Sequence, residues 1–213
     1  MRKVFGTSAA VAVAAGALSA VGCGGGTTTN TTGVPANGTT SGKGLRVYRE
    51  LAGSMEPTLT IGRQVKVAPL TSKPSVGEIV VFHPPKGAQR GICGPFPHVV
   101  RPGGAACAEP QSGEPARGTF IKRIVAGPGD EIYIREGHVY RRATRTSAFT
   151  AQPENFIKPC PAGAAACNFP TPIRIPAGHW FMMGDNRREP DDSRLFGPVP
   201  TESITGVVLA AAR

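Results

Sequence analysis

The sequence predicts a mostly β domain whose strands pair antiparallel. Short segments of alternating or β-branched apolar residues recur from about residue 45 to the end of the chain. The 28 glycines and 21 prolines punctuate these segments, as expected for strands joined by turns. No helical periodicity longer than two turns is present, and 213 residues are enough for one full domain.

The strands are expected in a definite order along the chain. Residues 45–50 alternate apolar and polar side chains and lead into a turn at Ser54. Residues 64–68 alternate in the same way, and residues 78–82 contain an unbroken β-branched run. The further strands are expected at residues 119–125, 131–134, 138–140, 179–183 and 205–211, the second and third of which form a hairpin.

Two segments, residues 83–118 and 142–172, are too long for ordinary connections and rich in Pro, Gly and Ala. Each carries two cysteines, which predicts a disulfide framework in an exported chain. Of the three pairings of four cysteines, the local ones are favoured because each staples a loop that has no core of its own. These pairs are Cys93 with Cys107 and Cys160 with Cys167. Zinc is the alternative, but no Cys-x-x-Cys spacing exists, so no metal or cofactor is expected.

The N-terminal residues 1–22 have the layout of a secretion signal, with a basic tip followed by small apolar residues. The run before Cys23 resembles a lipobox, which predicts cleavage there and a lipidated Cys23. The alternative is an uncleaved membrane anchor over residues 4–21. Residues 23–44 read as a flexible Gly/Thr-rich tether, and residues 45–213 as the folded domain.

The charge of the chain is strongly positive, with 24 Lys+Arg against 14 Asp+Glu and a formal net charge of +10. Such a balance suits a nucleic acid or an anionic membrane surface. No dense Lys/Arg run and no aromatic-rich RNA-binding signature is present, so no nucleic-acid partner is expected. The secretion signal instead places the folded domain outside the cytoplasm, at a membrane surface.

A sharp turn is expected around Ser54. Gly53 tolerates backbone angles that other residues avoid, and Pro57 blocks continuation of a strand. The turn would present the Ser54 hydroxyl and a backbone N–H at the lip of a sheet. A serine hydroxyl becomes a nucleophile only beside a proton acceptor, so the function of this turn depends on a base elsewhere in the chain.

Lys122 is the candidate base, in the middle of the strand expected at residues 119–125. Phe120 and Ile124 share its face of the strand, whereas Arg123 points the other way. Apolar neighbours desolvate an amine and lower its pKa, so that it can accept a proton from a serine hydroxyl. The alternative for a strand lysine is a solvent-facing charge that protects an edge.

Four ordered boxes carry a resemblance to a known family. They lie at residues 53–59, 76–82, 122–130, and 183–187 with 192–194 and 196–199. In this order they resemble the boxes of bacterial type I signal peptidases. The resemblance implies a β-rich fold of antiparallel sheets and an endopeptidase that cuts leader peptides from exported preproteins. It also implies Ser54 as nucleophile, Lys122 as general base, and a catalytic domain on the extracytoplasmic side of the bacterial cytoplasmic membrane.

Other matched positions have expected supporting roles. The Ser54 backbone N–H would donate to the oxyanion of the tetrahedral intermediate. Pro128-Gly129 suits a type II turn with Gly129 at positive φ. Asp185, Asp192 and Arg194 resemble the family's buried ion-pair cluster. The full set of expected supporting residues is Arg123, Gly129, Asp130, Gly184, Asp185, Asn186, Asp192, Ser193 and Arg194.

The substrate is expected to add as an extended strand to an exposed sheet edge near Ser54. Shallow apolar pockets there would admit Ala or Gly and reject larger side chains. Met55 and Leu59 fit such a pocket and the core equally well. The residues expected to line this surface are Tyr48, Leu51, Met55, Leu59, Phe120 and Ile121.

Two departures from the family pattern affect the chemistry. Ala52 stands where part of the family has a serine that donates to the oxyanion. Pro190 stands where a serine hydroxyl commonly orients the lysine, and Ser193 matches a different family position. Two alternatives therefore remain beside a general signal peptidase: a specialised relative that matures one exported substrate, and a non-catalytic lipoprotein that binds peptides.

Overall fold

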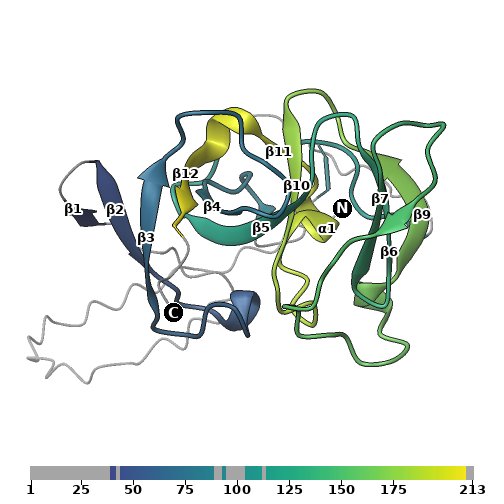
Figure 1. Ribbon diagram of the computed structural model, residues 1–213, viewed down its shortest axis with the longest axis horizontal. Coiled ribbons are helices and arrows are strands. Elements are labelled where there is room, and N and C mark those ends of the chain that lie inside the picture. Colours follow the sequence, from purple (N-terminus) through teal and green to yellow (C-terminus); the bar gives the residue numbers. More distant parts are fainter. Residues whose placement is uncertain (1–38, 42–43, 89–92, 95–103, 112–113, 210–213) are drawn as a thin grey trace, which may run out of the picture. The chain divides into compact units, whose positions relative to one another are not determined.

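The computed structural model describes residues 39–41, 44–88, 93–94, 104–111 and 114–209. The expected secretion signal, Cys23 and most of the expected tether lie outside these residues. Within them the chain is mostly β, as the sequence predicts, with every strand pair inside its sheets antiparallel (Figure 1).

The larger sheet has eight strands in the order β1-β2-β3-β12-β4-β5-β10-β11. β12, the last strand in the sequence, lies between β3 and β4 and pairs with both. It therefore joins two strands from the first half of the domain into one sheet. The bounds, in sheet order, are Thr39–Ser41, Leu45–Arg49, Gln64–Pro69, Ile204–Val208, Ile79–Phe82, Phe120–Ala126, His179–Met183 and Val199–Pro200.

The smaller sheet has four strands in the order β8-β7-β6-β9, of which β7, β6 and β9 are labelled at the right of Figure 1. Their bounds are Thr150–Ala151, His138–Arg142, Glu131–Arg135 and Phe169–Arg174. The expected β6–β7 hairpin is present. Glu136 and Gly137 join the two strands, both at positive φ (53° and 83°), which suits a tight hairpin turn.

Short helical turns complete the described elements. They are η1 (Gly53–Met55), η3 (Ala165–Cys167), α1 (Ser193–Phe196) and η4 (Thr201–Ser203). The helix α1 begins after Asp192, whose carboxylate accepts a hydrogen bond from the Arg194 N–H. Two of these turns carry residues expected at the site: η1 contains Ser54, and α1 contains Ser193 and Arg194.

The core consists of separate apolar clusters on the two faces of β5. Phe120 and Ile124 belong to one cluster, with Trp180 and Phe196. Ile121, one position along, belongs to another on the opposite face. A strand covered on both faces needs apolar residues at nearly every position, which explains the unbroken run around Lys122.

Part of the segment 142–172 is sheet rather than loop, contrary to the sequence prediction. β8 and the first residues of β9 lie inside it. The Pro, Gly and Ala content of the segment argued against strands, and Pro170 and Pro172 of β9 cannot donate to a ladder. β9 is an edge strand whose only neighbour in its sheet is β6, so its outer side needs no continuous row of donors. The expected tether likewise contains a short strand, β1, paired with β2.

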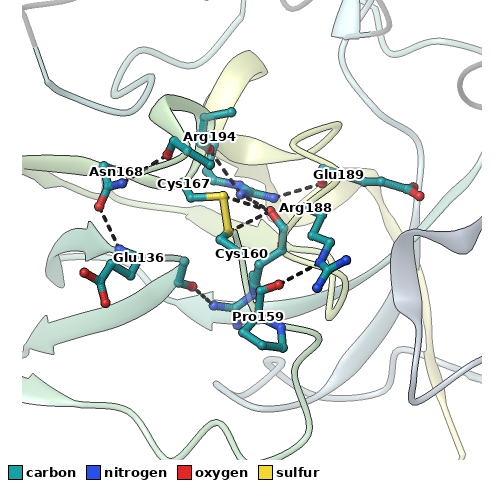
Figure 2. The surroundings of a disulfide bond; sticks show 12 residues. Glu136, Pro159, Cys160, Cys167, Asn168, Arg188, Glu189 and Arg194 are labelled. Carbon is teal, nitrogen blue, oxygen red and sulfur yellow. Dashed lines mark hydrogen bonds between the residues drawn. A yellow bond between two sulfur atoms is a disulfide. The ribbon is translucent and has the colours of Figure 1, made fainter. Parts of the chain in front are cut away.

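The structure contains both local disulfides, Cys93–Cys107 and Cys160–Cys167. Figure 2 shows the second disulfide, Cys160–Cys167. Its two sulfur atoms lie 3.3 and 3.6 Å from the carbonyl oxygen of Arg187. This disulfide therefore contacts the segment that follows β10, which also contacts the turn at Ser54.

Candidate active site

The turn that carries Ser54 is the 3-10 turn η1, which follows the end of β2. Its backbone is held by the segment after β10. The Asn186 N–H donates to the Ser54 carbonyl (2.9 Å), and the Asn186 side-chain amide donates to the Gly53 carbonyl (3.0 Å). A Cβ at Gly184 would overlap the Ser54 carbonyl oxygen, so glycine is required for this close approach.

Lys122 lies in the middle of β5, opposite Val80 of β4, and is only 3% exposed. Its amine lies 5.5 Å from the centroid of the Phe120 ring on the same strand face. Burial lowers the pKa of the Lys122 amine below its ordinary value, as the sequence predicts. Three acidic groups oppose this shift by stabilising the charged form, in decreasing order Asp192, Asp191 and Glu50.

Ser54 and Lys122 belong to elements that pack against each other, η1 and β5. Ser54 is also buried, with 6% of its surface exposed. Within the described residues no hydrogen bond joins the Ser54 hydroxyl to the Lys122 amine. The arrangement thus combines a buried hydroxyl with a buried amine that favours its neutral form, and free enzymes often close such contacts only when substrate binds.

Arg123 points away from Lys122, as expected, and its guanidinium forms a two-pronged ion pair with Asp185 (2.9 and 2.7 Å). Asp185 is fully buried and also accepts a hydrogen bond from the Thr58 hydroxyl (2.5 Å). This pair joins β5 to the segment after β10 and to the turn beyond Ser54. Arg123 also lies over the Phe156 ring, 3.9 Å from its centroid.

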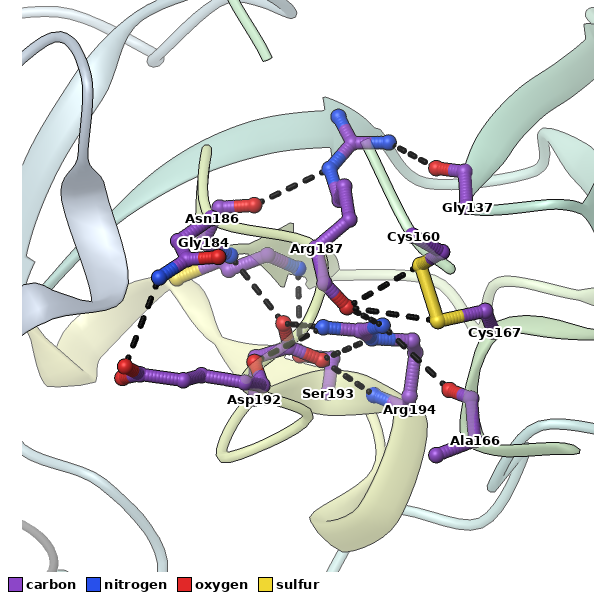
Figure 3. Close-up of polar contacts among 12 residues, drawn as sticks. Gly137, Cys160, Ala166, Cys167, Gly184, Asn186, Arg187, Asp192, Ser193 and Arg194 are labelled. Carbon is purple, nitrogen blue, oxygen red and sulfur yellow. Dashed lines mark hydrogen bonds and ion pairs between the residues drawn. A yellow bond between two sulfur atoms is a disulfide. The ribbon is translucent and has the colours of Figure 1, made fainter. Parts of the chain in front are cut away.

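Asp192 and Arg194 form a second, fully buried ion pair (2.7 Å) (Figure 3). Burial of Asp192 opposes its ionisation, but the charge and hydrogen bonds of Arg194 outweigh it and lower the pKa of this carboxyl. The Gly184 N–H donates to Asp192 (3.0 Å), which fixes the glycine that contacts Ser54. Asp185, Asp192 and Arg194 thus do not form a single cluster. Asp185 pairs with Arg123, and Asp192 pairs with Arg194.

The other expected supporting residues have identifiable partners. The Ser193 hydroxyl accepts from the Met182 N–H (3.0 Å), so it fixes α1 to β10. Gly129 has φ of 86°, and the Asp130 N–H donates to the Gly127 carbonyl (3.1 Å), as in the predicted type II turn. The Asp130 carboxylate accepts from the Gly127 N–H (2.8 Å) and closes the turn.

The six residues expected to bind substrate do not form one surface. Tyr48, Met55, Leu59 and Ile121 pack together in one buried cluster, and Met55 has no exposed surface. Phe120 lies in another cluster because alternate residues of a strand face opposite sides. Leu51 keeps partial exposure. For Met55 and Leu59 this burial favours the core interpretation over the pocket.

Sequence reasoning assigned no role to three buried residues near the candidate site, Arg187, Glu154 and Glu50. Arg187 is fully buried and pairs with Glu154 (2.5 Å), which comes from the segment expected to lie outside the sheets. Arg187 also donates to the Gly184 and Gly137 carbonyls. Glu50 is 4% exposed. Period-two alternation from Tyr48 places Glu50 on the inward face, a signal that the sequence already contained.

No group of three or more metal-ligating side chains occurs in the part of the chain that the structure describes. Among the helices described there, none is both long and apolar enough to span a bilayer.

A family model described as "Signal peptidase, peptidase S26" matches residues 44–211. The chain belongs to this family. The match covers η1, β5 and the segment after β10, so all the residues of the site lie inside it. The family assignment agrees with the resemblance that the four boxes carry.

Named relatives of this signal peptidase family are similar over most of the chain. The probable signal peptidase I-1 of Synechocystis sp. (strain ATCC 27184 / PCC 6803 / Kazusa) is 31% identical over 73% of this chain and 65% of its own. The thylakoidal processing peptidase 1, chloroplastic, of Arabidopsis thaliana is 31% identical over 72% of this chain and 37% of its own. The chain thus spans less than two thirds of the length of either relative.

A solved structure from the family also aligns with the chain. It is a signal peptidase I from Enterococcus faecalis V583, with a TM-score of 0.35 and 19% identity. The alignment covers 65% of this chain and 98% of that chain. The family assignment depends on the sequence matches, not on this alignment.

Proposed function

We propose that this chain is a membrane-attached serine endopeptidase that cleaves N-terminal signal peptides from exported preproteins. Ser54 is its nucleophile and Lys122 its general base. The observation that carries the proposal is the burial of Lys122, which favours a neutral amine. Membership of the signal peptidase family supplies the substrate class.

The chemistry requires one proton carrier and one nucleophile. The neutral Lys122 amine takes the Ser54 proton while the Ser54 oxygen attacks the scissile carbonyl carbon. The oxyanion of the tetrahedral intermediate faces the Ser54 backbone N–H. When the intermediate collapses, the Lys122 ammonium returns the proton to the leaving amine. A water molecule, deprotonated by the same amine, then attacks the acyl carbon, and the Lys122 ammonium returns that proton to the Ser54 oxygen as the signal peptide leaves.

Attachment at the extracytoplasmic face of a bacterial membrane follows from the N-terminal signal and the net charge of +10. A lipid on Cys23 or an uncleaved N-terminal anchor would each hold the domain at the surface where preproteins emerge. Mass spectrometry of the mature N-terminus separates them, since one predicts diacylglyceryl-Cys23 and the other an intact Met1.

The direct test is cleavage of a purified preprotein by the full chain in detergent. We expect one cut after an Ala-x-Ala-type site, identified by mass spectrometry of both products. Ser54→Ala should lose at least about 10³-fold in kcat/KM, because the nucleophile is removed. Full cleavage by this variant would overturn the assignment of Ser54, and absence of cleavage by the wild type would overturn the proposed activity.

A narrower activity on one dedicated substrate is the second candidate. The observation that favours this candidate is the position of the segment around Lys158. Lys158 forms a backbone bridge with Asn186 and an ion pair with Glu56 (3.0 Å). Glu56 directly follows η1, so this segment borders the proposed site. Cleavage of a single preprotein from a mixed set would support this candidate. Binding without turnover would instead support a peptide-binding module.

A further inference from the structure

Glu50 is a buried acid without the partner that its counterparts have. Within the described residues, every other buried acidic side chain has an arginine nitrogen within 4 Å. These pairs are Asp130–Arg141, Glu131–Arg142, Glu154–Arg187, Asp185–Arg123 and Asp192–Arg194. Glu50, at 4% exposure, has no such ion pair there. Burial of a carboxyl outside an ion pair costs desolvation energy that no arginine offsets, so its presence here calls for a role.

The carboxyl of Glu50 contacts the chain just before Ser54. One of its oxygens accepts a hydrogen bond from the Ala52 N–H (3.1 Å). The backbone of Glu50 is itself fixed, since its N–H donates to the Arg63 carbonyl and its carbonyl accepts from the Gly62 N–H. A rigid residue thus holds the segment that enters η1, two positions before the nucleophile.

The charge of Glu50 acts on the Lys122 amine. The charged groups that act on Lys122 are Asp192, Asp191, Glu50 and Arg194. Asp192 is already neutralised by Arg194, and Asp191 is only partly buried. The charged side chains that shift the pKa of Glu50 are Lys122, which lowers it, and Glu189, which raises it. Burial raises the pKa of the Glu50 carboxyl, and the hydrogen bond from Ala52 and the charge of Lys122 oppose this rise.

We infer that Glu50 is a positioning residue of the Ser54–Lys122 site: it holds the Ala52 end of the nucleophile turn and presents a negative charge to the Lys122 amine. The inference rests on the proposed function. It bears on the position of Pro190, where the hydroxyl that commonly orients the lysine is missing, because the Glu50 carboxyl is a buried polar group whose charge acts on Lys122.

The charge and the hydrogen bond have separable consequences. An ionised Glu50 stabilises the ammonium form of Lys122, whereas only the neutral amine accepts the Ser54 proton. Removal of the charge therefore favours the active form at lower pH. Removal of both the charge and the hydrogen bond also favours the neutral amine at lower pH. In addition it loosens the turn, which lowers kcat at every pH.

The test compares Glu50→Gln with Glu50→Ala in the full chain. The amide oxygen that Glu50→Gln introduces still accepts from the Ala52 N–H, so this variant removes the charge alone. We expect its acid limb of kcat/KM to move to lower pH, with kcat/KM about threefold above wild type on that limb. Glu50→Ala should show the same displacement and, in addition, about a tenfold lower plateau kcat.

Glu56→Gln is the matched control, because Glu56 lies beside the same turn but pairs with Lys158 and does not act on Lys122. Its acid limb should coincide with that of the wild type. Superposition of the Glu50→Gln profile on the wild type, or an equal drop in both Glu50 variants without displacement, would overturn the inference.

An NMR titration of the Lys122 side chain, assigned with Lys122→Met, gives a readout that does not require activity. We expect Lys122 to lose its proton at lower pH in Glu50→Gln than in the wild type. An unchanged titration would overturn the inference. A displaced titration in a chain that cuts no preprotein would support the coupling of Glu50 to Lys122 and overturn the proposed function.

Discussion

Lys122 shows how far a single residue can be understood from its neighbours in sequence. Phe120 and Ile124 share its strand face, and this alone predicted its desolvation correctly. The acidic groups around it could not be predicted in the same way. Glu50 lies 72 positions earlier and Asp191 lies 69 positions later, so only the fold brings them to the amine.

Burial of Lys122 should reduce stability in a pH-dependent manner. The unfolded chain keeps the Lys122 proton up to the ordinary value of 10.5, whereas the folded chain releases it at lower pH. Between these two pKa values the unfolded state binds more protons, so the free energy of unfolding contributed by this group rises with pH. The penalty is largest below the folded pKa and vanishes above the unfolded one.

Lys122→Met should therefore be more stable than the wild type by about 1–3 kcal/mol near neutral pH. This gain should shrink as the pH approaches 10.5. Urea unfolding of both proteins across this range measures the difference. A difference that stays constant with pH would show that Lys122 titrates alike in the folded and unfolded chains, contrary to its burial beside Phe120.

At the scale of elements, apolar patterns located most strands and failed where another force decides. β5 was predicted within one residue at either end because it is covered on both faces. β9 was missed because it contains Pro170 and Pro172, which a strand tolerates at the edge of a sheet but which the apolar pattern does not indicate. The four boxes indicated which segments meet, but the division of Asp185, Asp192 and Arg194 into two ion pairs depends on side-chain geometry that spacing does not encode.

The Asp192–Arg194 pair should be essential to α1 and to the placement of Gly184. Asp192→Asn leaves Arg194 as a buried charge without its counterion, which typically costs about 3–5 kcal/mol. We expect a loss of this size in urea unfolding at neutral pH. The wild-type contribution of the pair should itself decline as the pH falls through the lowered pKa of Asp192, because the folded state must then bind a proton.

Arg145→Ala provides a control for this variant, since Arg145 pairs with Glu131 from a side chain that is 77% exposed. Exposed pairs contribute little, so we expect a change below about 0.5 kcal/mol. Equal effects of the two substitutions would contradict the structural role assigned to the buried pair.

At the scale of the whole molecule, the site is assembled from segments that span most of the sequence. η1 supplies Ser54, β5 supplies Lys122, and the segment after β10 holds both through Asn186 and Asp185. The Cys160–Cys167 disulfide and Glu154 then contact Arg187 in the same segment. The segment with the Cys160–Cys167 disulfide thus contacts the segment that holds the Ser54 turn, a contact that its length and composition did not predict.

The central claim is that the neutral amine of Lys122 activates Ser54 for cleavage of a preprotein. The most direct measurement is turnover of a preprotein by Lys122→Met beside the wild type, with urea unfolding of both to establish that the variant is folded. We predict a loss of at least about 10³-fold in kcat in a variant that is no less stable. Undiminished turnover by the folded variant would contradict the account.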